Sequence, residues 1–203
     1  MEIESFLSTL LSYLQQTYNN GKHKNCEIQV GFCRTGGDLT IYISDNKGFA
    51  SGFYPLSFDS KSIKNYIKDH CTDANSEKYQ LVIVGTPHQF SGCLHAEMNI
   101  IRQLLIDISK KNNITQSTTL YLKGGKWPCK KCQEFIDLLN SVASQFITVN
   151  VLSPTDTKNP RQSPSEWSNP MDYLSIEEKQ YISALPESVY NTLLAVKSIK
   201  KQQ

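Results

Sequence analysis

The sequence predicts an α/β fold, in which helices pack on a sheet that contains at least one parallel pair of strands. Strand-like and helical patterns alternate from residue 79 to residue 152, the order expected of a layered α/β domain. Ahead of them, two runs rich in β-forming residues flank Thr35-Gly36-Gly37, which is a hairpin signal. The 203 residues, 39% of them hydrophobic, suffice for one domain with a single sizeable core.

The first half of the chain predicts two helices and a set of strands. Apolar side chains recur at helical spacing from Ile3 to Tyr18, and Asn19-Asn20-Gly21 ends this helix. A second, short helix is expected from Lys61 to His70. The strands expected here are residues 27–33 and 38–44, which form the hairpin, a continuation over 49–54, and a buried strand over 79–85.

The second half predicts alternating helices and strands, followed by a change in composition. The expected elements are a helix over 94–108, a strand over 118–122, a helix over 132–142 and a strand over 146–152. After Ser153 four prolines interrupt a polar segment, and residues 175–200 predict one or two helices broken at Pro186. We expect a single domain over residues 1–203, with a core at about 26–152 and a proline-rich loop and C-terminal helices over 153–203.

Composition gives no sign of a strong overall field. The formal net charge is +2, and the short basic run from Lys197 to Lys201 is typical of a solvated surface. The six cysteines are irregularly spaced and follow no signal peptide, which argues against a secreted, disulfide-bonded protein. No apolar run is long enough for a membrane span. We expect a cytoplasmic protein, or a toxin domain delivered into a target cell's cytoplasm, without a membrane partner.

Two short motifs supply the ligand set of a catalytic zinc site. His95-Ala96-Glu97 lies in the first turn of the helix expected over 94–108, and Pro128-Cys129-Lys130-Lys131-Cys132 opens the next helix. One imidazole and two thiolates can bind zinc while a fourth position stays open for water. The i, i+3 spacing of Cys129 and Cys132 puts both sulfurs on one side of a helical turn. We expect Zn²⁺ to be bound by His95, Cys129 and Cys132, and Glu97 to carry protons in catalysis.

Other roles for these residues explain the sequence less well. A structural zinc site needs a fourth ligand, and the nearest spare ligands are His88 and Cys93. A redox Cys-x-x-Cys pair without metal leaves His95 and Glu97 without a role. A zinc-stabilised binding module without enzymatic activity has no need of Glu97.

The two motifs, together with Thr119-Leu120-Tyr121-Leu122, resemble the cytidine deaminase-like superfamily. The Thr-Leu-Tyr strand ahead of the Pro-Cys helix is similar to the deoxycytidylate and tRNA adenosine deaminase branch. The resemblance covers residues 92–152 and implies a three-layer α/β/α sandwich with a five-stranded mixed sheet, to which this chain adds terminal helices. It also implies zinc bound by His95, Cys129 and Cys132, with Glu97 as the proton shuttle.

Four residues are candidate substrate contacts. Trp127 lies in the loop before Pro128, where its ring can stack on a base, and Lys126 beside it can meet a phosphate. In the resembling branch an asparagine near the end of the opening hairpin contacts the sugar, and our alignment places Tyr54 there. Phe90 precedes the catalytic helix and can line the mouth of the site. The competing interpretation packs Trp127 on the core and leaves the lysines in water.

The sequence therefore favours a zinc-dependent hydrolytic deaminase that converts cytosine to uracil in DNA or RNA, acting on a flipped or single-stranded base. The alternative is a deaminase of free cytidine or deoxycytidine nucleosides or nucleotides. The expected partner is accordingly a nucleic acid or a free cytosine nucleotide. The first function resembles that of bacterial toxin deaminases, for which an immunity protein would be a further partner. The sequence leaves the oligomeric state open.

Overall fold

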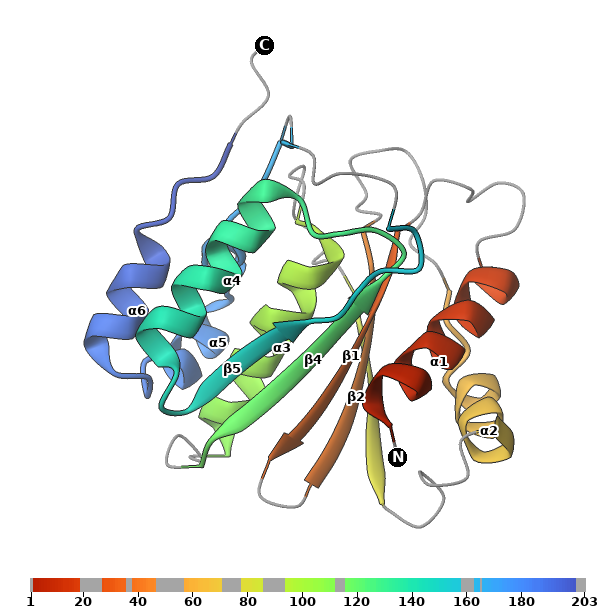
Figure 1. The fold of residues 1–203 in the computed structure, drawn as a ribbon. Helices are drawn as coiled ribbons and strands as arrows, with labels where there is room; N and C mark the ends of the chain where they lie inside the picture. The colour runs from red at the N-terminus through yellow and green to blue at the C-terminus, as the bar shows by residue number, and fades with distance from the viewer. Residues whose placement is uncertain are drawn as a thin grey trace.

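The protein has a mixed α/β fold built on a five-stranded sheet (Figure 1). The computed structural model describes residues 2–18, 27–35, 38–46, 57–70, 78–85, 94–111, 116–157, 163–164 and 166–199. The strands are β1 (Ile28–Thr35), β2 (Asp38–Asp45), β3 (Tyr79–Val84), β4 (Thr118–Gly124) and β5 (Ile147–Val151). They lie in the order β3-β2-β1-β4-β5. The predicted mixed sheet is thus confirmed.

Strand directions decide which loops share an edge of the sheet. The central strand β1 is antiparallel to β2 and to β4, whereas β2 is parallel to β3 and β4 is parallel to β5. Gly124, at the end of β4, is opposite Gln29, near the start of β1, and Asp45, at the end of β2, is opposite Ile28. The start of β1 and the ends of β2, β3 and β4 therefore meet at one edge.

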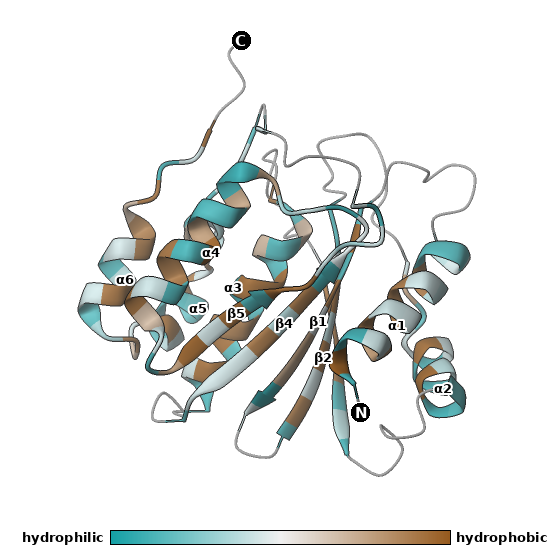
Figure 2. Cartoon of the chain, viewed as in Figure 1, coloured by the Kyte–Doolittle hydropathy of each residue, from teal (hydrophilic) through white to brown (hydrophobic). Residues whose placement is uncertain are grey.

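Helices α1 (Ile3–Tyr18) and α2 (Ser60–His70) lie on one face of the sheet, close to the bounds that periodicity predicted (Figure 1). Their apolar sides face the strands, and their polar sides face away (Figure 2). The alternation of β1 turns Ile28, Val30 and Phe32 toward the side chains of α1 and α2, with which they form one core cluster. This cluster is the smaller of two.

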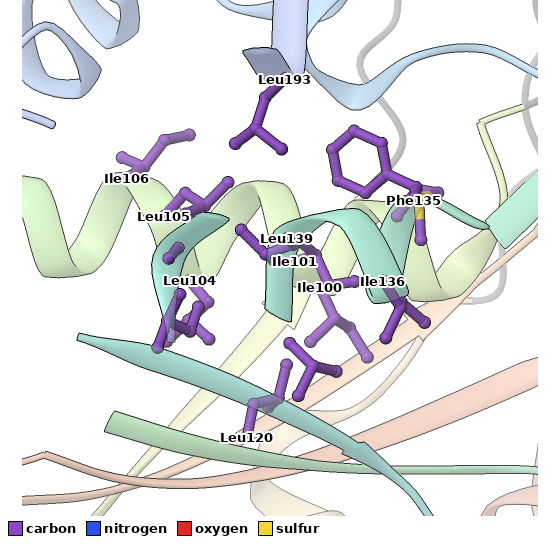
Figure 3. Packing of buried hydrophobic residues seen from close by; sticks show 14 of the residues in the cluster. Ile100, Ile101, Leu104, Leu105, Ile106, Leu120, Phe135, Ile136, Leu139 and Leu193 are labelled. Atoms are coloured by element: carbon purple, nitrogen blue, oxygen red, sulfur yellow. The ribbon is translucent and has the colours of Figure 1, made fainter. Parts of the chain in front are cut away.

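On the other face, α3 (Ala96–Lys110) and α4 (Lys130–Ala143) pack on the sheet (Figure 1). Outside them lie α5 (Ile176–Ile182) and α6 (Glu187–Leu194), which contact α3 and α4 respectively. Pro186 is the N-cap of α6, so the predicted break at this residue is confirmed. Leu120 of β4, Leu139 of α4 and Leu193 of α6 belong to one continuous cluster, which joins all these layers (Figure 3).

One strand is less buried than the sequence predicted, and another predicted strand lies outside the described residues. The strand over 79–85 was expected to be buried, but β3 lies at the edge of the sheet beside β2, and most of its side chains are only half-buried. An apolar run indicates a strand without stating how many neighbours it has, so the burial prediction was wrong. The continuation predicted over 49–54 lies outside the described residues.

Two further features concern the chain as a whole. None of the helices in the described ranges combines the length and apolar character that a membrane crossing requires. The described cysteines, Cys33, Cys129 and Cys132, are free thiols, and Cys33 is buried as a small apolar side chain.

Gly31, in the middle of β1, allows α3 to approach the sheet closely. A Cβ built there would lie 3.1 Å from Cγ2 of Ile100 and 3.2 Å from Cδ1 of Leu120. Gly31→Val should therefore lower the free energy of unfolding by about 1–3 kcal/mol through overpacking, measured by urea denaturation. Gly85→Val is the matched control, because a Cβ at Gly85 meets nothing within 4 Å. Equal losses in both variants would contradict the close-approach argument.

Candidate metal centre

Helices α3 and α4 both begin at the shared edge of the sheet, and each presents a cap residue there. His95 is the N-cap of α3 and Cys129 is the N-cap of α4, both with extended backbone. The sulfur of Cys129 accepts a hydrogen bond from the backbone N–H of Cys132 at 3.4 Å. Cys132 lies one turn into α4 and is fully buried. The expected i, i+3 arrangement of the two sulfurs is confirmed.

His95, Cys129 and Cys132 form a cluster whose donor atoms all lie within 4.8 Å of one another. The Sγ of Cys132 is 3.4 Å from Nδ1 of His95. Tetrahedral zinc bonds of about 2.0 Å to nitrogen and 2.3 Å to sulfur place two such donors about 3.5 Å apart. The three side chains thus fit a metal ion, and their one-nitrogen, two-sulfur donor set is compatible with zinc.

The two cysteines differ in charge state. Cys129 has a pKa lowered to about 4, chiefly because the Cys132 side chain hydrogen-bonds to its sulfur, with further help from His95. Burial raises the pKa of Cys132 well above its usual value, and the hydrogen bond with Cys129 adds to this. Burial lowers the pKa of His95, but its hydrogen bond with Cys129 and the negative charges nearby outweigh that effect and raise it. Cys129 is therefore ready as a thiolate ligand, whereas His95 and Cys132 would each release a proton on binding a metal ion.

Glu97 lies in the first turn of α3, two residues after His95, and only 3% of it is exposed. Burial raises the pKa of its carboxyl group, against the lowering effect of His95. A carboxyl group whose pKa is raised binds a proton more readily than an exposed one, which suits a group that accepts and returns protons beside potential metal ligands. This is the role that the sequence predicted for Glu97.

The structure adds Glu27, immediately before β1, which the sequence analysis did not single out. Its pKa is raised to about 7 by burial and by the negative charge of Glu97, while Lys126 and His95 act in the opposite direction. The amide of Gln29 donates to Oε1 of Glu27 at 3.2 Å. The Gln29 side chain has room because the residue opposite, Gly124, has no side chain. A Cβ at Gly124 would lie 2.0 Å from Nε2 of Gln29. No local sequence pattern predicts a role for Glu27, because only the pairing of β1 with its neighbouring strands brings this residue to the site.

At the open end of the β1–β2 hairpin, Asn46 and Glu27 are joined by two hydrogen bonds. Asn46 follows β2, its Oδ1 accepts from the backbone N–H of Glu27 at 3.0 Å, and its own N–H donates to the Glu27 carbonyl at 3.1 Å. The sequence analysis placed Tyr54 at this end of the hairpin. Tyr54 and Phe90 both lie outside the described residues, as do His88 and Cys93. The sequence Asp45-Asn46-Lys47-Gly48 is a turn signal, and it is the local pattern that could have identified Asn46.

The loop between β4 and α4 carries the other substrate candidates. Trp127 is half-buried there. Lys126 and Lys130 on either side of it are exposed. Lys131 forms an ion pair with Glu134 at 2.8 Å. Lys126 and Lys130 are the exposed basic residues flanking Trp127.

No protein-family model matches this chain, and neither do any of the curated proteins or solved structures compared with it. Of the features that the cytidine deaminase-like resemblance implies, the described residues contain the five-stranded mixed sheet and the cluster of His95, Cys129 and Cys132.

Cys132→Ser should abolish tight zinc binding, because a hydroxyl is a much poorer zinc ligand than a thiolate. Zinc content per protein, measured by mass spectrometry of metals after dialysis, should fall from about one to near zero. Cys33→Ser is the matched control, since Cys33 is equally buried but lies outside the cluster. Retention of zinc by Cys132→Ser would remove Cys132 from the ligand set.

Glu27→Gln should change how stability depends on pH. The pKa of Glu27 is about 7 in the folded protein against 4.5 for the free side chain, so the native state holds more protons between these values. The contribution of Glu27 to stability therefore falls as pH rises toward and through 7. Measured in metal-free protein with a chelator, Glu27→Gln should gain stability relative to wild type from about pH 5 to pH 8. A constant difference would contradict this.

Proposed function

We propose that this protein is a zinc-dependent hydrolytic deaminase with the three-layer α/β/α architecture of the cytidine deaminase-like superfamily. The observation that carries the proposal is a buried carboxyl group, Glu97, beside a three-ligand cluster of His95, Cys129 and Cys132. A structural zinc site takes four protein ligands, whereas a catalytic site keeps a position open. The cluster found among the described residues has three members.

The mechanism assigns distinct work to each residue. Bound by His95, Cys129 and Cys132, zinc would lower the pKa of a water molecule in its open position. Glu97 accepts a proton from the attacking water and delivers it to N3 of cytosine as the new C4–O bond forms. Glu97 then takes the remaining proton from the new C4 hydroxyl and passes it to the exocyclic amine. The C4–N bond breaks to release ammonia and leaves the C4 carbonyl of uracil. Water is consumed, uracil and ammonia are produced, and Glu97 returns to its starting state.

The substrate we propose is cytosine in a single-stranded or flipped position of a nucleic acid. Trp127 lies two residues before the ligand Cys129, within the loop that leads to the site. The exposed Lys126 and Lys130 flank it, which combines a stacking ring with charges that can meet phosphates. This arrangement supports a polynucleotide, with phosphates on both sides of the base, more than cytidine, which has no phosphate, or dCMP, which has one.

Product analysis tests the proposed substrate. The zinc-loaded protein is incubated with single-stranded DNA and RNA oligonucleotides, tRNA, cytidine, dCMP and adenosine. The products are then analysed by mass spectrometry before and after digestion to nucleosides. A gain of about one mass unit in oligonucleotides, with uracil in the digest, is the expected result. Conversion restricted to cytidine or dCMP would assign the protein to free nucleotides, and inosine would assign it to adenine.

Glu97→Gln should retain zinc and the fold but lose most of the turnover, by about 10²–10⁴-fold, because its amide cannot carry protons. Zinc content and thermal stability are measured on the same samples as the rate. Glu187→Gln, an exposed residue of α6, is the control and should keep the wild-type rate. Full activity in Glu97→Gln would exclude the proton-shuttle mechanism. Absence of activity in both the wild type and Glu187→Gln would favour a binding module without enzymatic activity.

A further inference from the structure

Trp167 belongs to the C-terminal segment, yet its side chain is buried against the helix that carries the two cysteines. None of its surface is exposed, and its ring centroid lies 6.0 Å from that of Phe135, one turn beyond Cys132 on α4. Trp167, Phe135 and Cys132 are members of the same core cluster. The proline-rich segment, which the sequence analysis assigned no role at the site, thus reaches the candidate metal centre.

The indole N–H of Trp167 is the unexplained group. Its Nε1 is buried and makes no hydrogen bond of ordinary geometry to any described residue. Buried polar groups in native proteins nearly always have a partner. Burial raises the pKa of Cys132, and the hydrogen-bonding contribution of the Trp167 side chain opposes that rise. Cys132 lies one turn before Phe135, the ring with which the indole pairs, and belongs to the same buried cluster. Its sulfur is therefore the acceptor within reach of this N–H.

Local structure holds Trp167 firmly in this position. Its backbone N–H and carbonyl form a pair of hydrogen bonds with Ile199, at 3.0 Å and 2.7 Å. Two residues later, the side-chain amide of Asn169 donates to the carbonyls of Leu193 and Val196, both at 2.8 Å. Further along the segment, Glu178 of α5 forms an ion pair with Arg102 of α3 at 2.6 Å, which joins the segment to the helix that carries Glu97. The indole is thus placed before any metal binds.

We propose that Trp167 is a positioning residue of the metal centre, whose indole N–H donates a hydrogen bond to Sγ of Cys132 when that sulfur binds the metal as a thiolate. The inference rests on the metal-binding part of the proposed function and not on the deaminase reaction. Hydrogen bonds to charged acceptors are stronger than those to neutral ones, so a metal-bound thiolate is a better acceptor for this N–H than a free thiol. The bond withdraws electron density from the sulfur and makes the bound metal a stronger Lewis acid.

The test compares Trp167→Phe with wild type, both loaded with Co²⁺, which reports on sulfur ligands through its charge-transfer absorption. Loss of the N–H should shift the sulfur-to-cobalt band to lower energy and weaken Co²⁺ binding by about 10-fold. Phe135→Leu is the control, because it damages the same packing without removing a donor, and its band should stay at the wild-type energy. An unchanged band and affinity in Trp167→Phe would overturn the proposal.

A second measurement uses the wild-type protein, in case Trp167→Phe does not fold. The chain contains two tryptophans, and Trp127→Phe identifies the indole N–H resonance of Trp167. Loading with ¹¹³Cd²⁺ should move this resonance downfield and split it by coupling through the sulfur. If the Trp167 indole N–H resonance neither shifts nor splits when ¹¹³Cd²⁺ is bound, the proposal is overturned. If the wild type binds neither Co²⁺ nor ¹¹³Cd²⁺, the metal centre itself, and the proposed function with it, is wrong.

Discussion

The candidate site depends on the start of two helices at the same edge of one sheet. Because β1 is antiparallel to both β2 and β4, and β2 is parallel to β3, the connections that follow β3 and β4 leave from that edge. Each connection leads into a helix whose N-cap is a potential ligand, His95 in one case and Cys129 in the other. Helix N-termini favour negative charge, which suits a thiolate. Sheet topology therefore brings the donors together.

Burial of ionisable groups at this edge works against the stability of the metal-free fold. Glu97 and Cys132 are both almost completely buried, and burial raises both pKa values. Such groups are costly in an apolar interior unless a partner compensates them. A metal ion bound by His95, Cys129 and Cys132 would supply that compensation, so metal binding and folding are coupled in the proposal. The same burial gives Glu97 the proton affinity that the proposed reaction needs.

The C-terminal segment extends the site beyond the two motifs. Helices α5 and α6 cover α3 and α4, and the segment ahead of them inserts Trp167 beside Cys132. Buried hydrogen bonds of Asn169 and the ion pair of Arg102 with Glu178 hold this cover in place. Near the start of β1, Gln29 donates a hydrogen bond to Glu27, and Gly124 leaves room for the Gln29 side chain. Glu27 from the N-terminal part of the chain and Trp167 from the C-terminal part thus lie near a cluster that the middle of the chain supplies.

The sequence by itself determined the local features. Regular apolar spacing predicted α1 with its bounds, the two-glycine turn predicted the β1–β2 hairpin, and motif spacing identified the three donors and Glu97. Only the tertiary structure decided that β3 is an edge strand and that Glu27 and Trp167 lie at the site. Periodicity, caps and motif spacing act between residues close in sequence. Contacts of Glu27 and Trp167 depend on strand order and on helix packing, which no short stretch of the chain encodes.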